Sequence, residues 1–298
     1  MERKYSFVLH SKSGYKFSGV YTVRQIERNG QPINIEGSLY IGNPKTNKKS
    51  EACVTITVNY PESVEEYERR HGIKSSIDPS IAHILLIKYY AKCADNRDLI
   101  KGEGTVEMVT SAMSFIKQIC PFVKEFDLKD SSYKMCDNNS PISLPYYYIA
   151  TKGKTWYESK FGAYLKPKSA YDEYKKMIQK TMSMKLEELE IFKIRYWKRT
   201  PEEVRKMMEA AYLKSDSMGD FLGKLHTKHG QNMMCLILQS WIEDYMRAIQ
   251  MDKYIVYSHL YIAAKDVPLY TFTNKNKTWK RKKISQNTRK NVWNNNSL

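Results

Sequence analysis

A turn with two glycines, followed directly by a helical pattern, constrains the fold of this chain more than any other segment. The turn is LIKGEGT at residues 99–105, and Val106, Val109, Met113 and Ile116 then repeat at helical spacing. Glycines one residue apart let the backbone turn tightly and approach a ligand closely. The helix would direct free N–H groups and its positive dipole end into the turn, which favours a phosphate. A plain tight turn is the alternative, because no Gly-Lys-Ser/Thr of a Walker loop follows.

The hydrophobic pattern predicts an α+β fold. Residues 4–58 alternate between apolar and polar side chains, as expected for antiparallel strands, and residues 123–128 add another strand. Residues 81–92 are rich in Ile, Leu and Tyr, which favours a buried strand that ends near Ala91, while their length would also suit a helix. Beyond about residue 168 the pattern becomes helical, with a strong helix start at residues 200–203. We therefore expect a mixed, mostly antiparallel sheet flanked by helices in residues 1–166, a mainly helical extension in 167–273, and a disordered basic tail in 274–298.

The charge of the chain favours a polyanionic partner. The formal net charge is +17, and the last 25 residues contain eight bases and no acid. Without that tail the body still has 41 basic against 32 acidic residues, so both parts attract nucleic acid, phosphorylated cofactors or an anionic membrane surface. No apolar stretch is long enough to span a bilayer and no signal peptide is visible, which predicts an intracellular protein.

Cysteine and histidine spacing predicts neither disulfides nor a metal site. The five cysteines are odd in number, widely spread and free of CxxC spacing, so we expect reduced thiols. His226 and His229 have a spacing that could chelate a metal on a helix, but no carboxylate or cysteine stands at a matching offset. Histidines at the end of a helix are the simpler interpretation of this pair.

A second segment, KTWYESKFGA at residues 154–163, follows the glycine turn in an order that indicates a known family. Strands, a glycine turn, a helix, a further strand and then a Tyr-Glu segment make residues 35–166 resemble the GCN5-related N-acetyltransferase superfamily. In that family an Arg/Gln-x-x-Gly-x-Gly/Ala turn binds the pyrophosphate of acetyl-coenzyme A. A later Tyr-Glu-x-x-Gly-Phe helix supplies a tyrosine that protonates the leaving thiolate.

The resemblance implies an acetyltransferase-like fold, acetyl-coenzyme A as the cofactor, and acyl transfer to an amine. The cofactor-binding positions would be Lys101, Gly102, Glu103, Gly104 and Thr105. Tyr157 would be the catalytic acid, while Glu103, Glu36 or a carbonyl with water would be the base. Packing of Trp156 and Tyr157 against the sheet is the structural alternative for that pair.

The basic tail predicts contact with nucleic acid. Bases interleaved with tryptophan suit phosphate contacts and stacking on nucleobases. A nuclear-localisation signal and a nonspecific charged tail are the alternatives. The predicted nucleic-acid-binding residues are Lys277, Trp279, Lys280, Arg281, Lys282, Lys283, Arg289 and Lys290.

Residues 142–145 and 153–158 also resemble uncharacterised proteins of giant DNA viruses. This resemblance implies an intracellular viral protein, in the cytoplasm or nucleus of an infected cell or in a virion. The alternative function is a non-catalytic protein of the acetyltransferase fold that binds nucleic acid or serves as a virion-associated structural protein. The sequence does not determine the oligomeric state.

Overall fold

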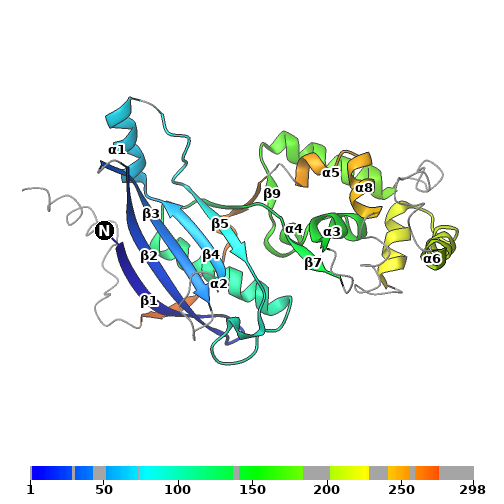
Figure 1. The fold of residues 1–298 in the computed structure, drawn as a ribbon, viewed down its shortest axis with the longest axis horizontal. Coiled ribbons are helices and arrows are strands. Elements are labelled where there is room, and N and C mark those ends of the chain that lie inside the picture. The colour runs from blue at the N-terminus through cyan, green and yellow to red at the C-terminus, as the bar shows by residue number, and fades with distance from the viewer. Residues whose placement is uncertain are drawn as a thin grey trace, which may run out of the picture. The chain divides into compact units, whose positions relative to one another are not determined.

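The computed structural model describes residues 2–28, 31–42, 52–72, 74–136, 141–183, 202–227, 241–255 and 259–274. These residues belong to two compact units (Figure 1). The first unit comprises residues 1–127 and the chain from residue 263 onward, and the second comprises residues 128–262. Within the described residues, no helix combines the length and the apolar character needed to cross a membrane.

The first unit is built on a large, mostly antiparallel sheet. Its strands follow the order β11-β1-β2-β3-β4-β5-β6. Each neighbouring pair from β11 to β5 is antiparallel. The strands are β1 (Glu2–His10), β2 (Lys16–Arg28), β3 (Gln31–Gly42), β4 (Ala52–Asn59), β5 (Ile81–Ile87), β6 (Glu125–Leu128) and β11 (Thr271–Asn274).

A parallel crossover joins β5 to β6 through the long helix α2 (Glu103–Ile119). The backbone N–H groups of Lys124 and Glu125 both donate to the carbonyl of Ser80, at 2.8 and 3.2 Å. Because Ser80 immediately precedes β5 and Glu125 begins β6, the two strands start at the same end of the sheet and run parallel. The expectation of an α+β chain, with a mostly antiparallel sheet flanked by helices, is confirmed.

Helix α2 covers one face of this sheet and forms the core of the first unit (Figure 1). Phe115 of α2 stacks on Phe7 of β1 at 4.0 Å between ring centroids and meets Phe272 of β11 edge-on at 5.0 Å. Gly37 makes room for Tyr21, since a Cβ on Gly37 would lie only 1.9 Å from the Tyr21 hydroxyl. The shorter helix α1 (Pro61–His71) contacts β3 and ends at Gly72 in the left-handed conformation.

The expectation of reduced thiols is wrong for Cys53, Cys93 and Cys136. Cys53 of β4 and Cys93 of the 3-10 helix η2 (Ala91–Cys93) form a buried disulfide with a Cα–Cα distance of 6.1 Å. Cys136 of the second unit is also disulfide-bonded, whereas Cys120 is a buried free thiol. Spacing could not reveal the pairing, because β4 and the segment after β5 meet only through the sheet register.

The second unit is mainly helical. Its helices are α3 (Leu144–Lys152), α4 (Trp156–Phe161), α5 (Lys168–Ser183), α6 (Glu202–Tyr212), α8 (Trp241–Ala248) and α9 (Asp252–Ile255). Strand β9 (Tyr164–Leu165) pairs with β10 (Leu260–Ala263), and β7 (Tyr133–Met135) pairs with β8 (Pro141–Ser143). The boundary expected after residue 166 falls inside this unit, because Glu158 of α4 accepts hydrogen bonds from Tyr171 and Tyr174 of α5.

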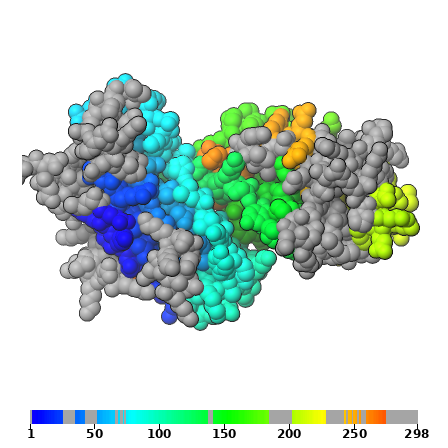
Figure 2. Space-filling view, in the orientation of Figure 1, coloured from blue at the N-terminus to red at the C-terminus, as the bar shows by residue number. Residues whose placement is uncertain are grey.

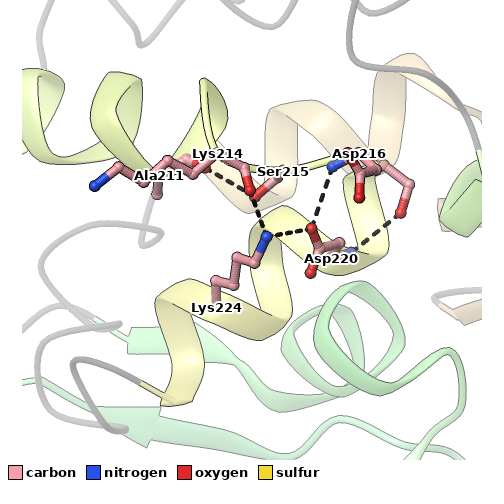
Figure 3. A network of polar contacts seen from close by, with 7 residues as sticks. Ala211, Lys214, Ser215, Asp216, Asp220 and Lys224 are labelled. Carbon is pink, nitrogen blue, oxygen red and sulfur yellow. Dashed lines mark hydrogen bonds and ion pairs between the residues drawn. The ribbon is translucent and has the colours of Figure 1, made fainter.

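A polar network closes the turn that follows α6 (Figure 3). Lys224 donates to the carbonyl of Lys214 and forms an ion pair with Asp220 at 2.6 Å. Asp220 also accepts from the N–H of Asp216 at 3.2 Å, and Ser215 donates to the carbonyl of Ala211. The hydrogen bond from Lys224 holds the pKa of Asp220 below its usual value, so the carboxylate stays charged at neutral pH.

Removal of the Cys53–Cys93 bridge should lower the free energy of unfolding of the first unit. The bridge spans a sequence separation of 40 residues, so its loss should cost up to about 4 kcal/mol through the larger entropy of the unfolded chain. Urea unfolding of the C53A/C93A variant measures this change. C120A is the matched control, because it removes a buried thiol that bridges nothing, and an equal loss in both proteins would contradict the prediction.

Candidate functional site

The predicted glycine turn lies directly at the amino end of α2. Gly102 caps the helix with φ +89° and ψ −88°, a conformation that a side chain would strain. Gly104 donates its N–H to the carbonyl of Ile100 at 3.0 Å, and Val106 donates to Gly102 at 3.0 Å. Among the described residues, no acceptor is present for the N–H groups of Glu103 and Thr105. The turn therefore presents unused donors at the positive end of a helix dipole.

The inner side of the turn is packed by side chains. Leu99 stands where the acetyltransferase turn has Arg or Gln, and it is only 2% exposed. A Cβ on Gly104 would lie 2.8 Å from Leu99 Cδ1 and 3.5 Å from the Tyr15 hydroxyl. Lys101 and Glu103 are exposed, whereas Thr105 is buried. Any anion at this turn therefore approaches from the side of Lys101 and the Gly102 backbone.

A histidine–aspartate pair lies between the two parallel strands that the turn and α2 connect. His83 is the third residue of β5 and Asp127 is the third residue of β6, and His83 Nδ1 is 2.6 Å from Asp127 Oδ1. Both side chains point away from α2, since Ala82, Ile84 and Phe126 fill the opposite, core-facing positions. The His83 side chain is 36% exposed and that of Asp127 is 9% exposed.

The electrostatics of the pair suit proton transfer. The hydrogen bond that the His83 ring donates to the Asp127 carboxylate raises the pKa of His83, and partial burial of the ring opposes this effect without cancelling it. The nearby charge of Asp78 also raises the pKa of His83. With Nδ1 bound to Asp127, Nε2 is the ring nitrogen left to accept a proton, and His83 has no further partner among the described residues.

This pair was missed at the level of sequence. His83 and Asp127 are separated by the whole β5–α2–β6 crossover, and no short motif contains both. One sequence feature could have indicated the pair, because each residue is the third of its strand. In a parallel crossover, residues at the same offset of adjacent strands become neighbours when the strands start in register.

The Tyr-Glu segment of α4 is held together by a capping box. Thr155 caps α4, accepts from the N–H of Glu158 at 3.1 Å, and donates its own N–H to the Glu158 carboxylate at 2.8 Å. That carboxylate also accepts from the Tyr174 hydroxyl at 2.7 Å. Thr155 and Glu158 thus form the Thr-x-x-Glu signature of a helix start, which explains this part of the segment by structure alone.

Tyr157 belongs to the second unit, whereas the glycine turn belongs to the first. Its side chain is 8% exposed, and its ring packs against Trp156 and Phe161. Burial, with a further contribution from the charge of Asp130, raises the pKa of Tyr157. The phenol is therefore fully protonated at neutral pH, and its service as a catalytic acid stays a prediction.

A cavity next to α4 is too small for a cofactor. It is lined by Asp130, Thr155, Tyr174 and Tyr254, among others, and its volume of about 10 Å³ is comparable to the space of one water molecule. Burial raises the pKa of Asp130, although two hydrogen bonds from Ser132 partly offset this. This cavity, whose lining also includes Pro145, Leu165 and Leu260, therefore has room for no more than a water molecule and cannot hold a substrate.

Of the remaining predicted residues, some make structural contacts and the others lie outside the described residues. Glu36, one candidate base, pairs with Arg24 at 3.0 Å and accepts from Ser38 at 2.8 Å. His226 accepts or donates a hydrogen bond with Tyr147, and His229 lies outside the described residues. The same holds for every predicted nucleic-acid-binding residue of the tail. The described ranges contain no group of three or more side chains suited to a metal ion.

Comparison of the chain with protein-family models, with curated proteins and with solved structures finds no match. A functional assignment therefore depends on the geometry of this chain alone.

The His83–Asp127 pair predicts a measurable change in pKa. Asp127→Asn should lower the pKa of His83, because the anionic acceptor is lost. The stability that the pair contributes should be full below the pKa of His83 in the unfolded chain, and should vanish as pH rises through the higher pKa of the folded protein. NMR titration of the His83 ring measures the first effect, and unfolding of both proteins across this pH range measures the second.

Thr57→Val is the matched control, because Thr57 lies opposite His83 on β4 and carries no charge. The titration of His83 should be the same in this variant as in the wild-type protein. A titration curve that D127N leaves unchanged would show that the two side chains do not interact in solution.

Proposed function

We infer that the first unit binds an acyl-coenzyme A and transfers its acyl group to an amine. The observation that carries this proposal is the β5–α2–β6 crossover, in which a glycine turn opens α2 beyond the carboxyl end of β5. In sheets of this kind, ligands bind outside the carboxyl ends of parallel strands, where helix amino termini meet. The resemblance of residues 35–166 to acetyltransferases supports acetyl-coenzyme A as the donor.

The turn would hold the phosphates of the cofactor. The N–H groups of Glu103 and Thr105 have no acceptor among the described residues, and the exposed Lys101 adds positive charge beside them. Gly102 has no side chain to block the approach, and nothing lies within 4 Å of the place where its Cβ would stand. These features suit an extended diphosphate on the outer side of the turn.

His83 would act as the general base of the reaction. It lies four residues before the end of β5, which is roughly 13 Å along the strand, and the pantetheine arm would have to reach it from the turn. The amine nitrogen attacks the thioester carbonyl and the carbon–sulfur bond breaks. His83 Nε2 would take the amine proton, and the imidazolium so formed would return a proton to the departing thiolate, which leaves as the free thiol. Asp127 holds the ring in the tautomer that this requires.

Gly102→Ala should weaken binding of acetyl-coenzyme A by at least about tenfold, because an alanine strains the turn at φ +89° and alters the direction of its N–H groups. Isothermal titration calorimetry measures the affinity. For the wild-type protein, ligand at a hundred times its Kd should raise the free energy of unfolding by about 2.7 kcal/mol.

Gly72→Ala supplies the matched control. Gly72 has φ +63° and equally open surroundings, but it caps α1 rather than α2. This variant should lose stability without losing affinity for the cofactor. Absence of binding by the wild-type protein would refute the proposed function.

His83→Gln should lower kcat for acetyl transfer to a primary amine by about 100-fold, since a positioned general base contributes at least this factor. The KM for acetyl-coenzyme A should change little, because His83 lies away from the turn. Stopped-time assays of amine acetylation measure both constants. His10→Gln is the control, as His10 is a half-buried histidine on β1 whose ring hydrogen-bonds to Thr273 and has no carboxylate partner among the described residues.

A further inference from the structure

A row of three tyrosines lies on the second unit, and each comes from a different element. Tyr164 of β9 stands between Tyr261 of β10 and Tyr171 of α5, with ring centroids 6.2 and 6.5 Å apart. All three side chains are partly exposed. We call Tyr164, Tyr171 and Tyr261 the tyrosine row.

Buried and half-buried residues of the second unit hold Tyr171 of the row in place. Tyr171 stacks on the buried Tyr174 at 6.0 Å and 23° between ring planes. The hydroxyl groups of both residues donate to Glu158, at 3.3 and 2.7 Å. Glu158 is itself locked in the capping box of α4. Because these contacts hold the Tyr171 ring in place, little entropy of that side chain remains to be lost when a flat ligand stacks on it.

Lysines flank the row on its exposed side. Lys166 Nζ lies 4.6 Å from the ring centroid of Tyr261, and Lys175 Nζ lies 4.9 Å from that of Tyr171. Lys168 shares the helix face of Tyr171 and Lys175, since the three stand at positions i, i+3 and i+7 of α5. The two ammonium groups thus lie over the outer rings of the row, whose middle ring, Tyr164, meets Tyr171 edge-on at 62°, and a base that stacks on an outer ring would displace its ammonium group toward the phosphates.

The wider surface is strongly basic. Residues 144–183 contain eight lysines and three acidic residues, and all eight lysines are exposed. Of the acids, Glu158 is bound to tyrosines and Glu173 pairs with Lys253 at 3.1 Å, which leaves Asp172 as an exposed counter-charge. Atoms of this part of the chain, drawn in green, are exposed over the second unit (Figure 2). The lysines are Lys152, Lys154, Lys160, Lys166, Lys168, Lys175, Lys176 and Lys180.

We propose that the tyrosine row and its flanking lysines bind single-stranded nucleic acid, with bases stacked on the rings and phosphates on the lysines. Stacking platforms combined with basic grooves bind single strands without regard to sequence. A duplex hides its base faces, so it can use the lysines but not the rings. The site is independent of the basic tail and of the proposed acyl transfer.

The test compares oligonucleotides that differ only in their bases. The full chain carries K277Q, W279L, K280Q, R281Q, K282Q, K283Q, R289Q and K290Q, so that every predicted nucleic-acid-binding residue of the tail is removed. Fluorescence anisotropy then measures its affinity for a thymidine oligomer of about fifteen nucleotides and for an abasic oligomer of the same charge. The thymidine oligomer should bind at least about tenfold more tightly, as each stacked base is worth ~1–3 kcal/mol.

Variants of the row separate stacking from charge. Y171L with Y261L should weaken thymidine binding by about fivefold or more and remove the preference over the abasic strand. K166Q with K175Q should lower the slope of log K against log salt concentration by about 1.4, since each phosphate contact contributes ~0.7 on single strands. The matched controls are Y212L, a partly exposed tyrosine of α6, and K206Q with K214Q, two exposed lysines of the same unit. These control variants should leave unchanged both the preference for the thymidine strand and the slope of log K against log salt concentration.

Three results would overturn the proposal. Equal affinity for the abasic and the thymidine strand would show that the surface is a simple polycation. Tighter binding to a duplex would exclude stacking. Tighter binding to vesicles of phosphatidylserine and phosphatidylcholine, with loss in the tyrosine variants, would assign the row to a membrane surface instead.

Discussion

Packing of α2 across the sheet is the constraint on which the first unit depends. The helix carries twelve buried residues, and Phe115 alone joins β1 and β11 through two ring contacts. That fit requires glycines in the facing strands, since Cβ atoms on Gly19 and Gly37 would collide with Phe7 and Tyr21. The same packing fixes where the helix begins, and it thereby sets the place of the Gly102 turn relative to β5.

One helix therefore determines both halves of the candidate site. Its amino end presents the turn, and its length returns the chain to the start of β5, where β6 begins. The return brings Asp127 beside His83, because both are the third residue of their strands. A different helix length would shift β6 and separate the pair. The turn and the pair are thus consequences of a single crossover rather than two independent features.

The sequence predicted those features that depend on local pattern. Helical spacing after the glycine turn anticipated α2, alternation anticipated β4, and the richness of residues 81–92 in Ile, Leu and Tyr favoured the strand β5 over a helix. The disulfide and the His83–Asp127 pair were not predictable, because each depends on the register between segments that are distant in sequence. The Thr155–Glu158 signature was visible, but it was interpreted as part of a family motif. In the structure those two residues form the capping box at the start of α4.

The second unit shows how buried acids can support a basic surface. The Glu158 carboxylate accepts hydrogen bonds from a backbone N–H and from Tyr174 at 2.8 and 2.7 Å, so its charge is satisfied inside the unit. Burial raises the pKa of Tyr174, and the charge of Glu158 raises it further, so the phenol stays protonated at any physiological pH. Because the Tyr174 phenol keeps its proton, its hydrogen bond to Glu158 persists, and the lysines around the tyrosine row define the charge of the surface. Such a surface should respond to salt concentration much more than to pH.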